Sequence, residues 1–384
     1  MKVLHTSDWH VGKAIRGESR ADEHRAVLQE IVGIAESEQV DLAIVAGDLF
    51  DSASPNAEAE EIVYRALLGL ASAGIPVAVI AGNHDNAKRL QAVAPLLELG
   101  KVHVVSEPTR PDEGGVMELT TAAGTNVRLA MLPFVSKRGI VRAEQLMEQA
   151  AFEHAQVYAE RLRLLVDHMC RGFTDDTVNI LAAHAFVLGA AAGGGERPAH
   201  LVEEYAITAQ SFPASIGYGA LGHLHRPQKL PAGPPLHYCG SPLQLDFGEG
   251  EQTKQVNIVT IEPGAPADVK AVELNSGWRL RTLRGGLDEL LTTEPPQNTW
   301  LRVIVQGATR AGLAQMVRDA LGPGVVDVRV EEAGRAAADG GVDHSNRSPL
   351  ELFDSYLERE GVADDRIRGL FAELLDHEVE GTER

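Results

Sequence analysis

Aspartate, asparagine and histidine side chains gather at five places along the chain, and each cluster directly follows a short apolar run. The clusters are Asp8-Trp9-His10, Gly47-Asp48-Leu49-Phe50-Asp51, Gly82-Asn83-His84-Asp85, His184 and Gly222-His223-Leu224-His225. A single Asp-x-His often arises by chance, and Asn and Asp are common in turns, so the indication comes from the joint occurrence of all five. Carboxylate, amide and imidazole donors without a thiolate suit Mn²⁺, Fe²⁺ or Zn²⁺ better than Ca²⁺ or Mg²⁺.

These clusters contain more donors than one ion needs, which indicates a pair of metal ions. The donors can serve two six-coordinate ions if one carboxylate bridges them and waters complete the shells. Two ions about 3.5–4 Å apart clamp a phosphoryl group and lower the pKa of a bridging water, which gives a hydroxide nucleophile. The residues therefore predict hydrolysis of a phosphate ester.

The apolar runs ahead of the clusters have the length and the Val, Ile, Leu and Ala content of strands buried on both faces. Strands are predicted at Lys2–Thr6, Asp41–Ala46, Pro76–Ala81, Val127–Leu132, Val178–Ala183 and Tyr218–Leu221. Helices are predicted at Glu23–Glu38, Ala57–Ala73 and Ala143–Cys170. The carboxyl ends of strands lie along one rim of such a sheet, where loops can bring distant donors together. This pattern predicts a layered α/β domain over residues 1–265.

Three further segments follow the first domain. Residues 270–333 carry predicted strands at 299–305 and 325–330 with a helix at 311–320, which indicates a small α/β capping domain. Residues 334–346 are polar and predict a linker. Residues 347–384 predict two amphipathic helices that begin at Ser348-Pro349 and have apolar faces. Such a pair is too small to fold alone, so we expect it to dock on a partner or on the chain's own first domain.

Composition narrows the class of protein further. With 35 Lys and Arg against 55 Asp and Glu the formal charge is −20, so bulk positive charge cannot hold nucleic acid, and any DNA contact would be local, metal-assisted or shared with a partner. Two cysteines, Cys170 and Cys239, exclude a disulfide scaffold and a cysteine-based zinc site. Without an apolar run of about 20 residues or a signal peptide, we expect a cytoplasmic protein that does not cross a membrane.

Taken together, the motifs resemble those of the calcineurin-like metallophosphoesterase superfamily, whose fold has two packed sheets flanked by helices. The resemblance implies two divalent metal ions, with Mn²⁺ as the expected ion. It implies that the first ion is held by Asp8, His10 and His225. The second ion would be held by Asn83, His184 and His223, and the Asp48 carboxylate would bridge the two.

The resemblance also implies two catalytic residues beside the ligands. His84 matches the family's catalytic histidine, which orients the phosphate or protonates the leaving 3′ oxygen. The alternative for His84 is a further metal ligand or a turn residue. Asp85 would then orient His84, as a carboxylate does for a catalytic imidazole. Asp51 stands where archaeal and eukaryotic relatives have a second histidine, so the resemblance assigns it no firm catalytic role. Cys239 replaces a serine of the family, and we interpret it as a small buried residue beside the site.

Three longer runs resemble those of the nuclease subunits of bacterial complexes that process DNA ends: residues 4–12, 222–228 and 238–242. This resemblance extends over the whole chain. It implies a double-strand 3′–5′ exonuclease and a single-strand or hairpin endonuclease for DNA repair and recombination. An SMC-like ATPase would be the partner, bound by residues 347–384. The chain would form a homodimer within a heterotetramer.

Two other functions stay open at this point. A phosphodiesterase for cyclic nucleotides or nucleotides would use the same motifs, although it would not need the capping domain or the helix pair. A scaffold that only anchors the ATPase would have eroded ligands, and none is eroded. Several basic residues near the motifs either contact DNA phosphates or lie on solvated helix faces: Lys13, Arg16, Arg20, Lys88, Arg89 and Arg226.

Overall fold

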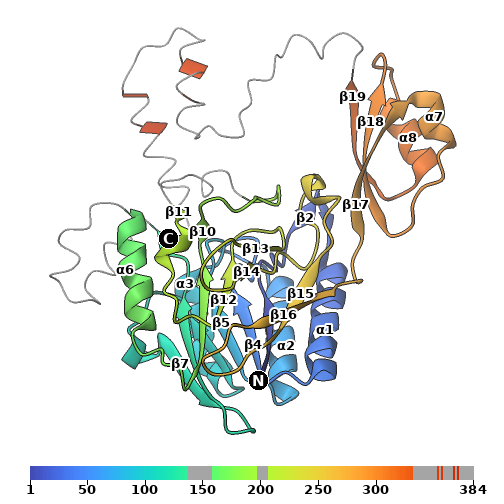
Figure 1. The fold of residues 1–384 in the computed structure, drawn as a ribbon. Helices are drawn as coiled ribbons and strands as arrows, with labels where there is room; N and C mark the ends of the chain where they lie inside the picture. The colour runs from blue at the N-terminus through green and yellow to red at the C-terminus, as the bar shows by residue number, and fades with distance from the viewer. Residues whose placement is uncertain are drawn as a thin grey trace.

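The computed structural model describes residues 1–136, 158–196 and 206–331, together with Phe353, Tyr356, Leu357, Arg366, Ile367, Leu370 and Phe371. Two parallel-rich sheets form a layered body, and a smaller α/β domain stands beside it, orange in Figure 1. The predicted fold class, two packed sheets flanked by helices with a small α/β domain, is confirmed.

The first sheet has the strand order β16-β15-β1-β4-β5-β6. Strands β1, β4, β5 and β6 are parallel, with β6 at one edge, whereas β15 and β16 run antiparallel to their neighbours. The bounds are Lys2–Thr6 for β1, Leu42–Ala46 for β4, Val77–Ile80 for β5, Val102–Val105 for β6, Gln255–Thr260 for β15 and Asp268–Glu273 for β16.

The second sheet has the order β13-β14-β12-β9-β8-β7, with β8, β9, β12 and β14 parallel. The bounds are Val116–Thr120 for β7, Asn126–Leu132 for β8, Val178–His184 for β9, Tyr218–Gly222 for β12, Gln228–Lys229 for β13 and Leu236–Tyr238 for β14. All six strands predicted for the first domain are therefore present in the two sheets, within one or two residues of the predicted bounds.

Three apolar layers hold this body together. Helices α1 (Ala21–Glu38), α2 (Ala57–Ser72) and α3 (Ala87–Glu98) cover the outer face of the first sheet, and α6 (Tyr158–Cys170) covers that of the second. Figure 1 shows α1 and α2 on one flank and α6 on the other. Alternate residues of the central strands point into the layer between the sheets, so β4 and β12 are buried on both faces as predicted.

The remaining elements of the body are short. Strands β2 (Ala14–Ile15) and β3 (Glu18–Ser19) form one small ribbon, and β10 (Phe186–Val187) and β11 (Ala206–Ile207) form another. The 3-10 turns are η1 (Pro111–Glu113), η5 (Ala209–Ser211) and η6 (Phe247–Glu249). Of the predicted helix Ala143–Cys170, only α6 lies within the described residues. No helix of the described segments is long and apolar enough to span a membrane.

The capping domain is a three-stranded parallel sheet with two helices on one face. Its elements are β17 (Arg279–Gly286), α7 (Leu287–Thr292), β18 (Thr299–Gln306), α8 (Leu313–Leu321) and β19 (Val325–Glu331). The predicted start of this domain at residue 270 falls inside β16, and β16 pairs with β15 along its whole length. Because that pairing makes it an edge strand of the first sheet, the capping domain begins after β16.

The capping domain contacts the body through Glu23 of α1. The Glu23 carboxylate accepts hydrogen bonds from the backbone N–H of Trp278 (2.7 Å) and the indole N–H of Trp300 (2.8 Å). A second contact is the ion pair between Arg16 and Asp327, 3.3 Å apart. In the C-terminal segment the rings of Phe353 and Phe371 stack with centroids 3.9 Å apart, so residues of the two predicted helices pack on each other. The predicted helix starts and ends around them lie outside the described residues.

Candidate metal centre

The predicted donors converge at one edge of the body, where β1, β4 and β5 of one sheet and β9 and β12 of the other end. All of them are buried, the most exposed being Asn83 at 5%. Residues far apart in the sequence become neighbours because parallel strands bring their carboxyl ends to a common rim.

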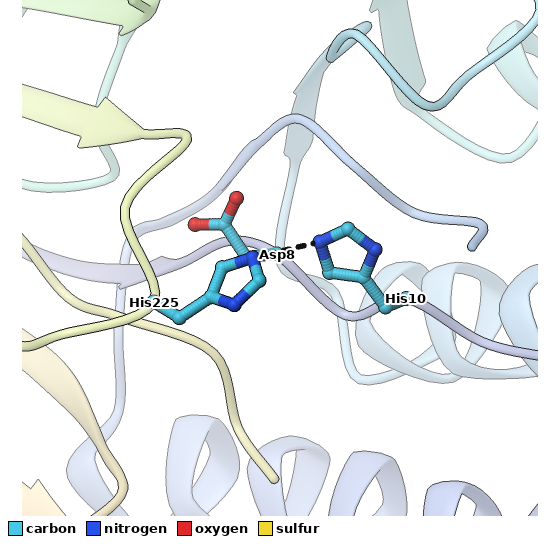
Figure 2. A group of neighbouring side chains, drawn as sticks. All are labelled: Asp8, His10 and His225. Atoms are coloured by element: carbon cyan, nitrogen blue, oxygen red, sulfur yellow. Dashed lines mark hydrogen bonds between the residues drawn. The ribbon is translucent and has the colours of Figure 1, made fainter. Parts of the chain in front are cut away.

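Asp8, His10 and His225 form what we call the first donor group (Figure 2). The Nε2 atoms of His10 and His225 face each other at 3.1 Å, and one donor atom from each of the three side chains lies within 4.8 Å of the others. The Asp8 carboxylate also accepts from the backbone N–H of His223 (2.9 Å) and from the hydroxyl of Ser7 (2.5 Å).

Asn83, His184 and His223 form the second donor group. The Asn83 amide oxygen lies 2.9 Å from His184 Nε2 and 2.8 Å from His223 Nδ1. The other nitrogen of His184, Nδ1, lies 2.8 Å from the backbone oxygen of Ala46, at the end of β4. Because a carbonyl only accepts, this contact places the proton on Nδ1 and turns Nε2 toward the group.

Asp48 lies between the two donor groups. Its Oδ2 atom is 3.5 Å from His10 Nε2 in the first group and 3.4 Å from His184 Nε2 in the second. Burial opposes ionisation, but the neighbouring His184 and His84 hold the pKa of Asp48 well below its ordinary value. In return Asp48 raises the pKa of His184 to about 9 despite burial of the imidazole. A shared anion between two clusters of nitrogen donors is the arrangement that a bridging ligand requires.

The main chain at the site adopts backbone conformations that residues other than glycine rarely take. Asp8, His10, Asp48 and His223 all have positive φ, between 47° and 104°. The glycine ahead of Asp48 is required as well, because a Cβ on Gly47 would lie 2.3 Å from His184 Nδ1. The turns after β1, β4 and β12 therefore aim their donors inward at the cost of local strain.

His84 and Asp85 lie beside the donors, but not in the relation that the sequence suggested. His84 Nδ1 is 2.8 Å from the backbone oxygen of Asp51, and the His84 ring meets His10 edge-on at 4.5 Å. The Asp85 carboxylate accepts from the backbone N–H groups of Leu49, Phe50 and Gly82. The prediction that Asp85 orients His84 is thus wrong, because its oxygens are taken up in tying the Asp48 turn to the Gly82 turn.

Asp51, for which the sequence assigned no firm role, faces the first donor group. Its Oδ1 atom is 3.5 Å from His10 Nδ1 and 3.1 Å from the Lys13 ammonium. Although burial raises the pKa of this carboxyl, His10 and Lys13 hold it below its ordinary value. Cys239 is fully buried beside the site, with its Sγ atom 3.0 Å from the Ser7 hydroxyl.

Sequence reasoning missed a second layer of charged residues behind His225. Glu249 is fully buried, and its Oε1 atom is 3.0 Å from His225 Nδ1. Burial raises its pKa, but Lys254 and His225 hold the pKa at about 2. Glu196 accepts from the backbone N–H of His225 at 2.9 Å. The flanking segments have no periodicity, and their glycines, such as Gly195, were the available signal: a Cβ there would lie 2.5 Å from Glu249.

The basic residues near the motifs differ in what they can do. Arg20 is buried and donates to the backbone oxygen of Gln244 and to Glu23, so it cannot reach DNA. Lys13 and Arg16 form ion pairs with Asp51 and Asp327, and Arg89 forms one with Glu60. Of the candidates, Arg20 is thereby excluded as a phosphate contact.

The donors fit two divalent metal ions. Buried imidazole nitrogens point at one another and at carboxylate or amide oxygens within two groups, and such donors would be poorly satisfied without a cation among them. Oxygen and nitrogen donors without thiolate match a borderline or hard divalent ion. Among the described residues, the groups of side chains placed to hold a metal ion contain neither of the two cysteines.

Fold and site together define a metal-dependent phosphoesterase. The family model described as calcineurin-like phosphoesterase matches residues 1–206, more than half of the chain. A second model, described as the type 5 capsule protein repressor C-terminal domain, matches residues 278–361, which include the capping domain.

Curated relatives narrow this class. The SbcD subunit of the nuclease SbcCD from Bacillus subtilis (strain 168) is 34% identical over 389 residues, covering 97% of this chain and 97% of the relative. The Rhodobacter capsulatus protein of the same name is 34% identical, covering 69% of this chain and 67% of the relative. The Escherichia coli (strain K12) protein is 31% identical, covering 79% and 77%. The chain therefore belongs to the calcineurin-like phosphoesterases and, within them, to the SbcD family of SbcCD nuclease subunits.

Proposed function

We propose that this chain is a Mn²⁺-dependent DNA nuclease that works with an SMC-like ATPase in DNA end processing, repair and recombination, in the cytoplasm at the nucleoid. It would act as a 3′–5′ exonuclease on double strands and as an endonuclease on single strands and hairpins. The observation that supports it most is Asp48, placed about equally far from a histidine of each donor group. The similarity to relatives named as SbcD subunits of the nuclease SbcCD supports the substrate class and the complex.

The residues would divide the work as follows. The first donor group would hold one ion, the second donor group the other, and Asp48 would bridge them. When bound, divalent ions supply positive charge that offsets the charge of the phosphodiester and activates water. The His84 Nδ1 atom faces the Asp51 backbone oxygen, so Nε2 would be the atom that orients the phosphate or protonates the leaving oxygen. Asp85 would contribute indirectly, by holding the turns that carry Asp48 and Asn83.

The C-terminal segment, residues 347–384, is the proposed contact with the ATPase. Stacking of Phe353 on Phe371 joins its two halves. Tyr356 (49%), Ile367 (39%) and Leu370 (56%) remain exposed around that stack. An apolar surface on a helix pair is a common way of docking a partner protein. Deleting residues 347–384 should abolish capture of the ATPase and leave hydrolysis of a small phosphodiester intact, and loss of both would show that the segment belongs to the enzyme's own fold.

A homodimer is proposed through α2 and α3. Leu96 and Leu99, at the end of α3, are exposed at 70% and 86%. Leu68 of α2 is exposed at 42% and lies against Gly100, next to Leu99. Sedimentation of the full chain should show a dimer that Leu96→Glu with Leu99→Glu converts to a monomer, whereas Met316→Glu, an exposed apolar residue of α8, should leave the dimer unchanged.

The activity is tested with end-labelled single-stranded and hairpin DNA, Mn²⁺ and the purified chain beside His84→Asn. We expect cleavage that falls by about 10²–10⁴-fold in the variant, the range for loss of a general acid or base, while Mn²⁺ binding is kept. Equal cleavage by both proteins would remove His84 from the mechanism. Hydrolysis of a small phosphodiester without DNA cleavage, even after addition of the ATPase, would favour the small-substrate alternative.

A further inference from the structure

Glu249 holds the imidazole of His225 in one orientation. It ends η6, is fully buried, and lies 24 residues beyond His225 in the chain. Its Oε1 atom is 3.0 Å from His225 Nδ1. Because a carboxylate only accepts, Nδ1 carries the proton, and Nε2 is the His225 atom directed at His10 in the first donor group.

Lys254 in turn holds Glu249 in place. The Lys254 ammonium donates to Glu249 Oε2 (2.7 Å) and to the backbone oxygen of His225 (2.9 Å). Its third N–H group is left for Ser241 Oγ and Gln252 Oε1, which lie 2.9 Å and 3.0 Å from the Lys254 nitrogen. The same Glu249 oxygen accepts from the backbone N–H of Leu245 at 3.0 Å. One buried cation therefore fixes both the carboxylate that orients the His225 ring and the main chain from which that ring projects.

A buried ion pair has a desolvation cost that its own attraction barely offsets. Replacing such a pair by apolar side chains of similar size is often neutral for stability. Stability alone therefore gives little reason for Glu249 and Lys254 to be charged. Orientation of a metal-binding imidazole by a carboxylate, by contrast, needs a charged acceptor at this place.

We propose that Glu249 and Lys254 are positioning residues that fix His225 for the ion of the first donor group and so set the affinity of that site separately from the second. This inference rests on the two-ion site of the proposed function. In the second donor group the matching contact of His184 Nδ1 is with the backbone oxygen of Ala46. Only the first group therefore depends on this pair of side chains.

The test is titration calorimetry of the metal-free full chain with Mn²⁺, together with its thermal unfolding. The unaltered chain should bind two equivalents. Glu249→Met leaves Lys254 buried without its carboxylate, so it should lower the unfolding temperature as well as the affinity. Glu249→Met with Lys254→Met removes both charges and should recover the unfolding temperature, while one equivalent stays about 10–100-fold weaker, the usual cost of losing such a partner.

Two further variants separate positioning from support of the fold. Glu249→Gln with Lys254→Met returns an uncharged acceptor to His225 Nδ1 and should recover part of the lost affinity. Glu23→Gln, which removes a carboxylate that pairs with Arg20 away from the site, should bind both equivalents as the unaltered chain does. Full affinity for both equivalents in the double Met variant would overturn the positioning role. Fewer than two equivalents in the unaltered chain would overturn the two-ion site itself, and the inference with it.

Discussion

The two donor groups use the same kinds of side chain, but their histidines are held in different ways. In the first group, His225 is oriented by the carboxylate of Glu249, which arrives from a separate segment. In the second group, His184 is oriented by a backbone oxygen at the end of a central strand. A side-chain partner can be removed by one substitution, whereas a backbone partner can be displaced only by moving the strand. The orientation of His225 can therefore be changed by substituting its partner, whereas that of His184 is fixed by the fold.

The largest effect on metal binding is expected at Asp48, whose loss should affect the two donor groups alike. Asp48→Asn removes the anion that lies between both groups. The affinity for both Mn²⁺ equivalents should fall by more than about 100-fold, the upper cost of losing a residue that only contacts a ligand. Nuclease activity should fall to background. Calorimetry and DNA cleavage check this. Loss of only one equivalent would mean that Asp48 belongs to one group and does not bridge.

The orientation of His184 in the second group should be changed only through the main chain that holds it. Gly47→Ala places a Cβ 2.3 Å from His184 Nδ1 at a φ of +91°, so it should weaken the second equivalent and destabilise the metal-free fold. Gly12→Ala is the matched control, because Gly12 also has positive φ but a Cβ there meets nothing closer than 3.6 Å. Calorimetry on both variants should show weakened binding for Gly47→Ala alone. Equal losses in the two would assign the effect to backbone strain.

Asp51 should produce a smaller change, confined to the first group. Its carboxylate lies 3.5 Å from His10 Nδ1, whereas His84 is held by its backbone oxygen, which Asp51→Asn keeps. We expect a loss of up to about 10-fold in the affinity of one equivalent and near-normal cleavage at saturating Mn²⁺. Cleavage that stays low at saturating Mn²⁺ would instead give the Asp51 side chain a part in the reaction.

The smallest effect is expected on stability, at His5, a histidine outside both donor groups. It distinguishes the pH dependence of folding from the pH dependence of the metal site. Burial lowers the pKa of His5 from 6.5 to about 3. The unfolded chain then binds a proton that the folded chain does not, so this stability is present above pH 6.5 and is lost as the pH falls toward 3. Between pH 7.5 and 5.5 the metal-free chain should lose about 1 kcal/mol more stability than the His5→Gln variant loses. Urea unfolding at the two pH values measures the difference, and parallel losses would contradict it.

The sequence was informative where the main chain decides the geometry. Strand-forming runs followed by Asp48, Asn83 or His223 indicate both the sheets and the rim at which these donors meet, because parallel strands share an edge. The glycines ahead of these residues belong to the same local signal, since the turns leave no room for a Cβ.

The rest of the site could not be read from spacing, because it depends on which side chains meet in three dimensions. Glu249 ends the single 3-10 turn η6 and Lys254 directly precedes β15, so no periodic pattern marks them as partners of His225. Asp85 was misjudged for the opposite reason: it adjoins His84 in sequence, yet its oxygens are used by backbone N–H groups across the turn. Adjacency along the chain is a poor guide to which group a carboxylate will satisfy.

The positive φ angles at Asp8, His10, Asp48 and His223 have a consequence for how the protein matures in a cell. Each such residue raises the free energy of the folded chain by about 1–3 kcal/mol, before any ion is bound. An ion that binds only the folded form stabilises it by mass action and so offsets part of this free-energy cost. Cellular supply of the metal would then govern how much enzyme accumulates, in addition to how fast each molecule turns over, and chains made during metal starvation would be the first to meet proteases.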